Sequence, residues 1–397
     1  MASLPRVIVK PRRARPFFAR HPWLFVTSIA RVEGEPKPGS EVEVFSHEGQ
    51  FIARGLFNPN SAIRVRLYRW DGGPLDDEFW AKTVAAAVRL RREVLHLGGP
   101  NAAYRLIASE SDGLSGLTVD RYDRWLVVQF TSLALFERRE MLIGLLAQEP
   151  DLEGILSRPD RTTAEQEGIR PHEDVFHGSA PVAPVEIIEN GLTFWVDVKA
   201  GQKTGFYLDQ RENRRAVAQY CQGKRVLDLF TYTGAFALNA LKHGGAESVL
   251  GIDSSSTAIE VARHHAVLNQ LGKARFESAD VFDALETIRG GSDRFGVVIC
   301  DPPKFARHPR GVEDALKGYL RLNRAALDVL EPDGLLVTFS CSGLVERGLF
   351  ADLIGQLAEL SGRSIQILEQ RGQAPDHPVS ASCLETEYLK GFVCRVS

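Results

Sequence analysis

The stretch Arg225-Val226-Leu227-Asp228-Leu229-Phe230-Thr231-Tyr232-Thr233-Gly234-Ala235-Phe236 joins a short apolar run to a loop with one glycine and then to a helical pattern. A glycine lets ligand and backbone approach closely, and the start of a helix offers free backbone N–H groups. Downstream, strand-like runs alternate with helical patterns. We expect strands at 225–230, 248–253, 274–278, 296–300 and 334–340, and helices at 234–243, 256–271, 312–330 and 345–360. This alternation predicts a mostly parallel α/β sheet that binds ligands at the carboxyl ends of its strands.

Three acidic residues lie near the ends of the first three predicted strands. Asp253 comes 25 residues after Asp228 and can accept hydrogen bonds from ribose hydroxyls. Asp280 is placed to reach an adenine amino group, although Asp is also a favoured helix N-cap. Because no GxGxxG motif is present to cradle a pyrophosphate, a cofactor without phosphate is favoured. The sequence therefore predicts S-adenosylmethionine as the cofactor, with binding residues Asp228, Phe230, Thr231, Gly234, Asp253 and Asp280.

The fourth predicted strand runs into Asp301-Pro302-Pro303-Lys304, and the fifth runs into Ser340-Cys341-Ser342. Two consecutive prolines cannot extend a central strand, so the chain turns and leaves the Asp301 carboxylate at the strand tip. Carbon 5 of a pyrimidine is too weak a nucleophile to take a methyl group directly, and addition of a thiolate at carbon 6 activates it. We predict Cys341 as this nucleophile and Asp301 as the group that holds the base. Cys300 is expected to face the core, because strand residues alternate faces.

Positive charge is concentrated at the N-terminal end of the chain. Residues 1–70 hold 12 Lys and Arg against five Asp and Glu, whereas the whole chain has a net charge of −3. The first 20 residues are basic and contain the adjacent aromatics Phe17 and Phe18, a composition that suits phosphate contact and base stacking but also occurs in solvated arms. Strand-like pieces over 39–70 predict a small β-barrel. RNA is therefore the expected partner of this end.

The length of 397 residues predicts two or three domains, and we expect three, at 1–72, 73–182 and 183–397. The first is the β-barrel, the second is α+β with a helix over 76–97 and a hairpin over 117–130, and the third binds the cofactor. The longest apolar runs are a few residues long and the N-terminus lacks a secretory stretch, so we expect a cytoplasmic protein without a membrane partner. The five cysteines show no CxxC pair or zinc spacing, which predicts neither disulfides nor a metal site.

Together these motifs resemble the RlmI-like cytosine-C5 methyltransferases of large-subunit ribosomal RNA, over essentially the whole chain. Other shared segments are Glu110-Ser111-Asp112-Gly113-Leu114-Ser115-Gly116-Leu117, Gly201-Gln202-Lys203-Thr204-Gly205-Phe206-Tyr207-Leu208-Asp209-Gln210-Arg211 and Asp376-His377-Pro378. Ser115 departs from the family's usual proline. The resemblance implies a PUA-like domain, an α+β middle domain and a class I methyltransferase domain with a Rossmann-like, mostly parallel seven-stranded sheet. It also implies Cys341 as the nucleophile, cytosine as the target base, and Lys203 and Gln210 close to the cofactor.

Two other functions are compatible with these residues. Asp-Pro-Pro also occurs in enzymes that methylate a ring or exocyclic nitrogen of RNA, and Cys341 would then be a bystander. A noncatalytic RNA-binding or ribosome-assembly factor could keep the fold with the cofactor as a structural ligand, although Asp301 and Cys341 argue against this. Thiolate chemistry does not separate cytosine from uracil, and a homodimer is possible.

Overall fold

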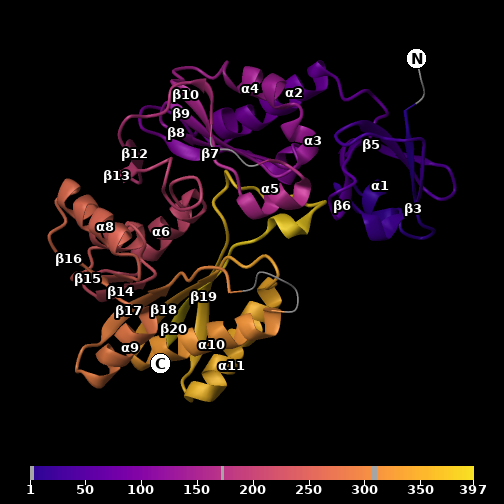
Figure 1. Cartoon of the computed structure of the whole chain (residues 1–397). Coiled ribbons are helices and arrows are strands. Elements are labelled where there is room, and N and C mark those ends of the chain that lie inside the picture. The colour runs from indigo at the N-terminus through magenta and orange to yellow at the C-terminus, as the bar shows by residue number, and fades with distance from the viewer. Residues whose placement is uncertain (1–3, 171–173, 306–310) are drawn as a thin grey trace. The chain divides into compact units, whose positions relative to one another are not determined.

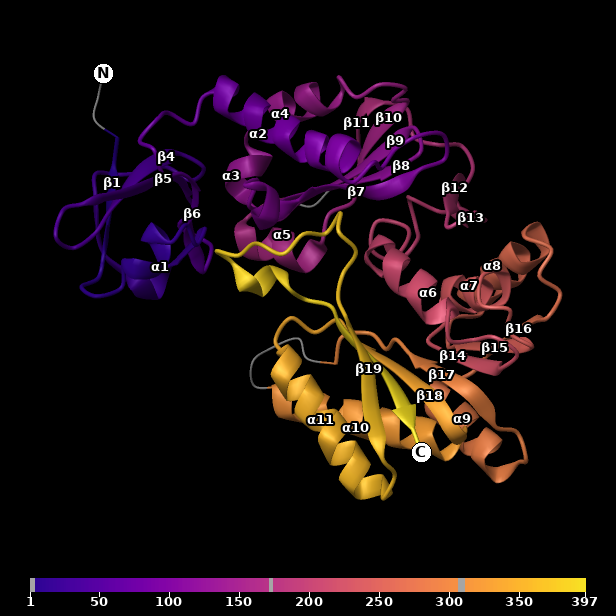
Figure 2. The same cartoon turned by 180° about the vertical axis from the view of Figure 1, so that it is seen from behind.

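A computed structural model describes residues 4–170, 174–305 and 311–397 of the chain, shown from opposite sides in Figures 1 and 2. The chain forms two compact units. The first comprises Met1–Ile187, Val196–Leu208 and Pro375–Thr386, and the second comprises Ile188–Trp195, Asp209–Ala374 and Glu387–Ser397. A two-stranded hairpin is formed by β12 (Val185–Glu189) and β13 (Leu192–Val196). Within the described residues, no helix combines the length and the apolar character needed to cross a membrane.

The second unit is built on a seven-stranded sheet in the order β16-β15-β14-β17-β18-β20-β19. Its strands are β14 (Arg225–Leu229), β15 (Ser248–Asp253), β16 (Ala274–Ser278), β17 (Phe295–Cys300), β18 (Leu330–Ser340), β19 (Ile365–Arg371) and β20 (Lys390–Val396). The strands from β14 to β18 are parallel, and β20 runs antiparallel between β18 and β19. Every residue of β17 is buried, because helices cover both faces of a parallel sheet. The predicted α/β fold class is confirmed.

Helices lie on both faces of this sheet. One face carries α6 (Arg211–Ala218), α7 (Ala235–Lys242) and α8 (Ser256–Leu268), and the other carries α9 (Val281–Gly290), α10 (Val312–Asp328) and α11 (Arg347–Ser361), as Figures 1 and 2 show. Ala315, Tyr319 and Leu322 of α10 recur at helical spacing and are buried in the core against the sheet. The expected strands and helices of this unit are present with small changes in their bounds, and α9 is an additional helix that the sequence pattern did not single out.

A six-stranded sheet in the order β2-β6-β5-β4-β1-β3 forms the N-terminal part of the first unit. Its strands are β1 (Arg6–Val9), β2 (Trp23–Phe25), β3 (Ile29–Glu33), β4 (Glu41–Phe45), β5 (Phe51–Phe57) and β6 (Ile63–Arg69), with a short 3-10 turn at Val26–Ser28. Residues 4–20 belong to this fold, since β1 is part of its core and α1 (Arg15–Phe18) buries Phe17. The buried Phe17 is therefore not available for the base stacking that we expected of it, whereas Phe18 is 45% exposed.

The rest of the first unit is an α+β assembly around a five-stranded sheet in the order β11-β10-β9-β8-β7. Its elements are α2 (Asp77–Arg89), a π-helical turn at Leu90–Val94, β7 (Ala103–Ala108), 3-10 turns at Ser109–Asp112 and Leu384–Thr386, β8 (Leu117–Tyr122), β9 (Trp125–Phe130), α3 (Leu133–Phe136), α4 (Arg139–Leu146), β10 (Gly154–Ser157), α5 (Arg161–Glu167) and β11 (Val175–Gly178). The predicted hairpin over 117–130 is β8 and β9. Leu56 and Tyr68 of the N-terminal sheet pack into the same core. The division into three domains stays a prediction.

Candidate active site

Asp228 lies near the end of β14 and is almost fully buried. Its Oδ2 atom accepts hydrogen bonds from Thr231 Oγ1 at 2.6 Å and from the backbone N–H of Ala237 at 3.1 Å. Its Oδ1 atom is buried and has no hydrogen-bond partner in the part of the chain that the structure describes. Burial raises the pKa of Asp228 to about 7, and the negative charges of Asp301 and Asp253 act in the same direction. A buried carboxylate oxygen without a partner is a site for a donor that is not part of this chain.

The loop between β14 and α7 has an unusual backbone. Phe230 and Tyr232 have φ angles of 61° and 49°, in the left-handed region that residues with a Cβ rarely adopt. Gly234 has a φ of 85°, and a Cβ atom there would lie 2.8 Å from the Phe276 ring. Such conformations persist only where the surroundings enforce them, and they are concentrated at ligand sites. Phe230, Thr231 and Gly234, predicted to bind the cofactor, are therefore held together in one tight turn.

Asp253 and Asp280 stand at the ends of the next two strands, as predicted. Asp253 Oδ2 accepts from the backbone N–H of Tyr232 at 2.9 Å, and its Oδ1 accepts from that of Ser255 at 2.9 Å. Asp280 caps α9, because its Oδ1 atom accepts from the N–H of Phe282 at 2.8 Å. Each carboxylate oxygen can accept more than one hydrogen bond, so these contacts leave room for further donors. Contacts of Asp253 with ribose and of Asp280 with adenine stay predictions.

Lys203 and Gln210 were assigned to the cofactor only through the family resemblance. Lys203 belongs to the first unit, where its Nζ lies 4.4 Å from the centroid of the Tyr207 ring. Gln210 belongs to the second unit, and its Oε1 atom accepts a hydrogen bond of 2.6 Å from Asn213 Nδ2. Gln210 is thus a buried support of the start of α6. A contact of either residue with the cofactor stays a prediction.

The residues around β14 fit S-adenosylmethionine. The Oδ1 atom of Asp228, which has no partner among the described residues, suits a cationic donor, and S-adenosylmethionine has an ammonium group that can donate to it. The tight turn at Gly234 leads directly into α7, whose first N–H groups complete the polar surroundings. Asp228, Thr231, Gly234 and Asp253 are the residues that would hold the cofactor, which supplies the methyl group when bound.

Cys341 follows the last residue of β18 directly. Its Sγ atom lies 3.8 Å from the carbonyl oxygen of Pro302, so the thiol sits against the Asp301-Pro302-Pro303 turn at the end of β17. The register of the parallel strands β17 and β18, in which Cys300 pairs with Thr338, explains why Cys341 lies beside Pro302: both strands end at the same edge of the sheet. Of the five cysteines, all in described segments, Cys341 alone is not buried. The structure therefore brings the two predicted catalytic residues to one edge.

Tyr319 is a residue of this site that the sequence reading missed. Its hydroxyl accepts a 3.0 Å hydrogen bond from Ser340 Oγ and lies 3.2 Å from Ser342 Oγ. The tyrosine, which is buried in α10, thus bonds to the serines on either side of Cys341. Burial raises the pKa of Tyr319, which keeps the phenol neutral. In the sequence, a tyrosine at a core position of a helix indicates only hydrophobic packing. The hydrogen bonds of Tyr319 to the two serines could therefore be found only from the fold.

Cys300, the rival nucleophile, lies in the core as predicted. Its exposed fraction is 0%, and it belongs to the core cluster that contains buried residues of β17 and α10. Burial raises its pKa far above the ordinary range, and the nearby carboxylates of Asp228 and Asp301 raise it further. A thiol that does not ionise and has no solvent access is not a nucleophile.

Two of the family segments have structural roles in the first unit. Asp376 Oδ2 accepts from the backbone N–H of Arg105 at 2.9 Å, and its carbonyl oxygen accepts from Arg91 Nη2 at 2.7 Å. Arg91 also donates to Asp112 at 2.7 Å, which ties the 3-10 turn after β7 to the π-helical turn after α2. Such buried, paired charges fix one arrangement of the segments that they connect. The Asp376-His377-Pro378 segment is therefore an anchor of this unit.

A cluster of His21, Cys383 and Glu385 has the ligand types of a metal site. The backbone N–H of Trp23 donates to His21 Nδ1 at 3.2 Å, so the ring proton is on Nε2, which lies 3.3 Å from Glu385 Oε1. Burial raises the pKa of Cys383 to about 12, which favours the neutral thiol over the thiolate that binds metals. These hydrogen bonds connect His21 to β2 through Trp23 and to the 3-10 turn at Leu384–Thr386 through Glu385.

The raised pKa of Asp228 predicts that cofactor binding depends on pH. At pH 5.5 Asp228 is mostly protonated, and at pH 7.5 it is mostly the carboxylate that attracts a cation. Because affinity scales with the competent fraction, the Kd for S-adenosylmethionine should fall roughly 25-fold over this range. Calorimetric titrations at several pH values measure this, with Asp228→Asn as the variant in which the dependence should disappear. An unchanged dependence in that variant would assign it to another group.

Known proteins and protein families match this chain in two ways, by domain families and by relatives over nearly the full length. Residues 7–70 match the PUA-like domain family, and residues 149–383 match the S-adenosylmethionine-dependent methyltransferase family. A protein of Erwinia tasmaniensis named ribosomal RNA large subunit methyltransferase I is 40% identical over 395 residues, covering 98% of this chain and 99% of that protein. One of the same name from Aliivibrio fischeri is 41% identical over 381 residues, covering 95% and 96%.

Solved structures share the fold over the whole length. A SAM-dependent methyltransferase from Streptococcus mutans superposes with a TM-score of 0.84 at 20% identity, covering 98% of this chain and 99% of that one. A methyltransferase structure complexed with SAH has a TM-score of 0.85 at 21% identity, with the same coverage.

The fold, the strand-end site and these matches define the chain as an S-adenosylmethionine-dependent methyltransferase with a PUA-like domain. Within this class, it belongs to the ribosomal RNA large subunit methyltransferase I family, because the relatives of that name match it at about 40% identity over nearly its full length. The predicted family, fold class and cofactor are confirmed.

Proposed function

We propose that this protein methylates carbon 5 of a cytosine in large-subunit ribosomal RNA through a covalent adduct with Cys341. The observation that carries this proposal is the 3.8 Å distance between Cys341 Sγ and the carbonyl oxygen of Pro302, next to Asp301. A nucleophile and a polar group that can hold the base are thus combined at one strand edge with the acids of the cofactor site. The names of the relatives support ribosomal RNA as the substrate.

In the proposed reaction, the thiolate of Cys341 forms a bond to carbon 6 of the ring, and the electron pair of the carbon 5–carbon 6 double bond moves to carbon 5. Carbon 5 then takes the methyl group of S-adenosylmethionine. A base removes the proton from carbon 5, the double bond forms again, and the carbon–sulfur bond breaks to release Cys341. Asp301, as a carboxyl group, gives its proton to N3 while the thiolate adds and accepts a hydrogen bond from the neighbouring exocyclic amino group. The proton returns from N3 to Asp301 as the carbon–sulfur bond breaks.

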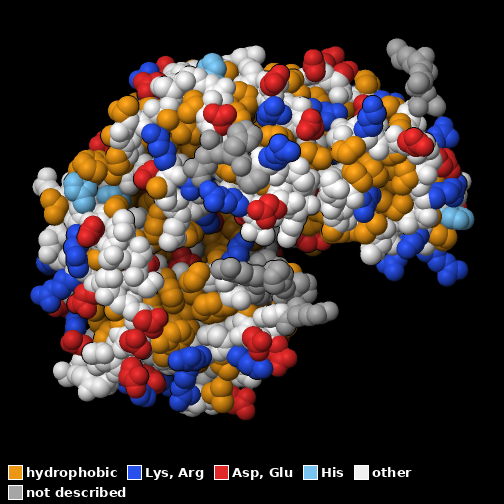
Figure 3. All heavy atoms as spheres, viewed as in Figure 1, with side chains coloured by type: hydrophobic (Ala, Val, Ile, Leu, Met, Phe, Trp, Pro, Cys, Tyr) orange, Lys and Arg blue, Asp and Glu red, His pale blue; other side chains and the backbone are white. Residues whose placement is uncertain are grey.

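The N-terminal sheet supplies a surface that suits the phosphates of RNA. Arg12, Arg13, Arg15 and Arg20 are all exposed there, beside the exposed ring of Phe18. Figure 3 shows Lys and Arg side chains along the lower right border of the face, over the part that α1 and β3 occupy in Figure 1. Cationic side chains of this kind contribute to RNA affinity through the phosphates, independently of the RNA sequence. We assign RNA docking to this surface and the chemistry to the second unit.

Nucleoside analysis of ribosomal RNA tests the function directly. Ribosomal RNA lacking the modification should gain one 5-methylcytidine per molecule when incubated with the protein and S-adenosylmethionine, as measured by mass spectrometry of nuclease digests. A methyl group on a nitrogen, or none at all, would contradict the proposal. The appearance of 5-methyluridine would keep the chemistry and change the target base.

A further inference from the structure

Lys390 is a buried lysine at the edge of the site that the mechanism above does not use. It is the first residue of β20 and pairs in register with Ser340, the last residue of β18. Its Nζ donates hydrogen bonds to the carbonyl oxygen of Ser342 at 2.7 Å and to that of Tyr388 at 3.0 Å. Lys390 therefore contacts the chain on both sides of Cys341, by its backbone at Ser340 and by its ammonium at Ser342.

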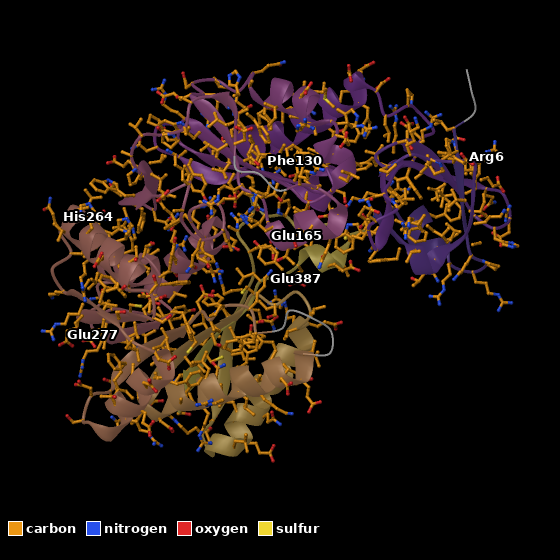
Figure 4. All side chains as sticks on the ribbon, in the orientation of Figure 1. Arg6, Phe130, Glu165, His264, Glu277 and Glu387 are labelled. Atoms are coloured by element: carbon orange, nitrogen blue, oxygen red, sulfur yellow. The ribbon has the colours of Figure 1, made fainter. Side chains whose placement is uncertain are left out.

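In the part of the chain that the structure describes, the surroundings of this ammonium do not include a paired acid. Glu387, labelled in Figure 4, lies on the segment that leads into β20, and it accepts a 3.0 Å hydrogen bond from Arg347 Nε. Among the described residues, no carboxylate forms an ion pair with Lys390 within 4.0 Å, and its exposed fraction is 1%. A buried cation is costly unless an opposite charge compensates it. Carbonyl oxygens compensate for only part of this cost.

Cys341 is the group that can provide the missing negative charge. Burial lowers the pKa of Lys390 to about 8, whereas Glu387 and the negative charge of a Cys341 thiolate both raise it. Coulombic coupling is mutual, so the interaction that stabilises the ammonium also stabilises the thiolate. The thiolate, not the thiol, is the form that adds to carbon 6.

We propose that Lys390 is a positioning residue that holds the Ser340-Cys341-Ser342 turn and stabilises the thiolate of Cys341. This inference rests on the proposed function, because it gives the nucleophile of that reaction its reactive form. The ammonium donates to backbone carbonyls and is shielded from solvent, so it acts through Cys341 and does not touch the base.

Other charged and titratable groups face the same turn, and their charges also stabilise or destabilise the Cys341 thiolate. Tyr319 of α10 bonds to both serines, and Asp301 stands at the end of β17; a negative charge on either opposes a thiolate. Lys304 is exposed, and Arg347 is paired with Glu387. Of these described groups, Lys390 is therefore the buried cation whose charge no ion pair compensates.

The test is the pH dependence of Cys341 alkylation, which requires neither RNA nor methyl transfer. Iodoacetamide reacts with thiolates, and the other four cysteines are buried, so peptide mass spectrometry can follow Cys341 alone. In the wild-type chain, the alkylation rate should titrate below the ordinary cysteine pKa of about 8.5. Lys390→Met removes both charge and hydrogen bonds, whereas Lys390→Gln keeps a donor for the Ser342 carbonyl. Both variants should react about tenfold more slowly at pH 7, with the profile moved to higher pH.

The matched control is Lys317→Met, which removes an exposed lysine of α10 and should leave the profile unchanged. Thermal unfolding and S-adenosylmethionine binding identify any variant that does not fold. A wild-type profile at or above pH 8.5, or a folded Lys390→Gln variant with the wild-type profile, would overturn the inference. Because the readout is alkylation, a chain that methylated another atom could still show the shifted profile, so failure of the proposed function and failure of this inference are distinguishable.

Discussion

The variant Cys341→Ala should lose methyl transfer to ribosomal RNA by about 1000-fold or more while it keeps its fold and its affinity for S-adenosylmethionine. Without the sulfur, no thiolate can add to carbon 6, so carbon 5 does not become nucleophilic. Removal of a catalytic nucleophile lowers kcat by orders of magnitude. Transfer of a labelled methyl group from the cofactor to RNA measures the loss. Cys383→Ala is the matched control, since it removes a buried sulfur from the first unit and should change stability but not turnover.

RNA that contains 5-fluorocytosine separates the covalent route from its alternatives. Fluorine at carbon 5 cannot be removed as a proton, so the adduct persists after methylation and the protein stays joined to the RNA. A complex that survives denaturing electrophoresis should form with the wild-type chain in the presence of S-adenosylmethionine and should be absent with Cys341→Ala. Full methyl transfer by Cys341→Ala would instead show that a nitrogen accepts the methyl group.

The central sheet could be predicted from the sequence because both of its faces are buried. β17, for example, is buried along its whole length and therefore reads as an uninterrupted apolar run. In a parallel sheet, chain order decides which residues stand at the carboxyl edge. Asp228, Asp253, Asp301 and Cys341 could therefore be assigned to one edge before any coordinates were known.

Features that depend on distant pairing could not be predicted in this way. Lys390 faces Ser340 only because β20 inserts antiparallel between β18 and β19, and local periodicity does not report this insertion. The one available signal was a lysine that opens an otherwise mostly apolar strand, Lys390–Val396. β1 was not predicted for a different reason. The strand is four residues long and lies in a basic stretch, so its short apolar run, which is buried, was taken as part of a charged segment.

The substitution Asp301→Asn should lower kcat about 100-fold to 1000-fold with a much smaller change in KM, in the range seen when one polar group that stabilises a transition state is removed. As the thiolate adds to carbon 6, electron density moves onto the ring and N3 takes up a proton. A carboxyl group at N3 can carry that proton, whereas an amide can still hold the base through one donor and one acceptor. Binding of the cytosine is therefore retained while addition becomes slow.

Steady-state kinetics with ribosomal RNA, together with the rate at which the 5-fluorocytosine adduct forms, measure this effect. Asp301→Ala should also raise KM, because it removes both hydrogen bonds to the base. Asp314→Asn, at an exposed position of α10, is the matched control and should leave both constants unchanged. If Asp301→Asn raised KM and left kcat intact, Asp301 would only bind the base, and the proton at N3 would have to come from another group. Equal losses in the adduct rate and in kcat would instead place Asp301 in the addition step itself, since a role confined to methyl transfer would leave the adduct forming at the wild-type rate.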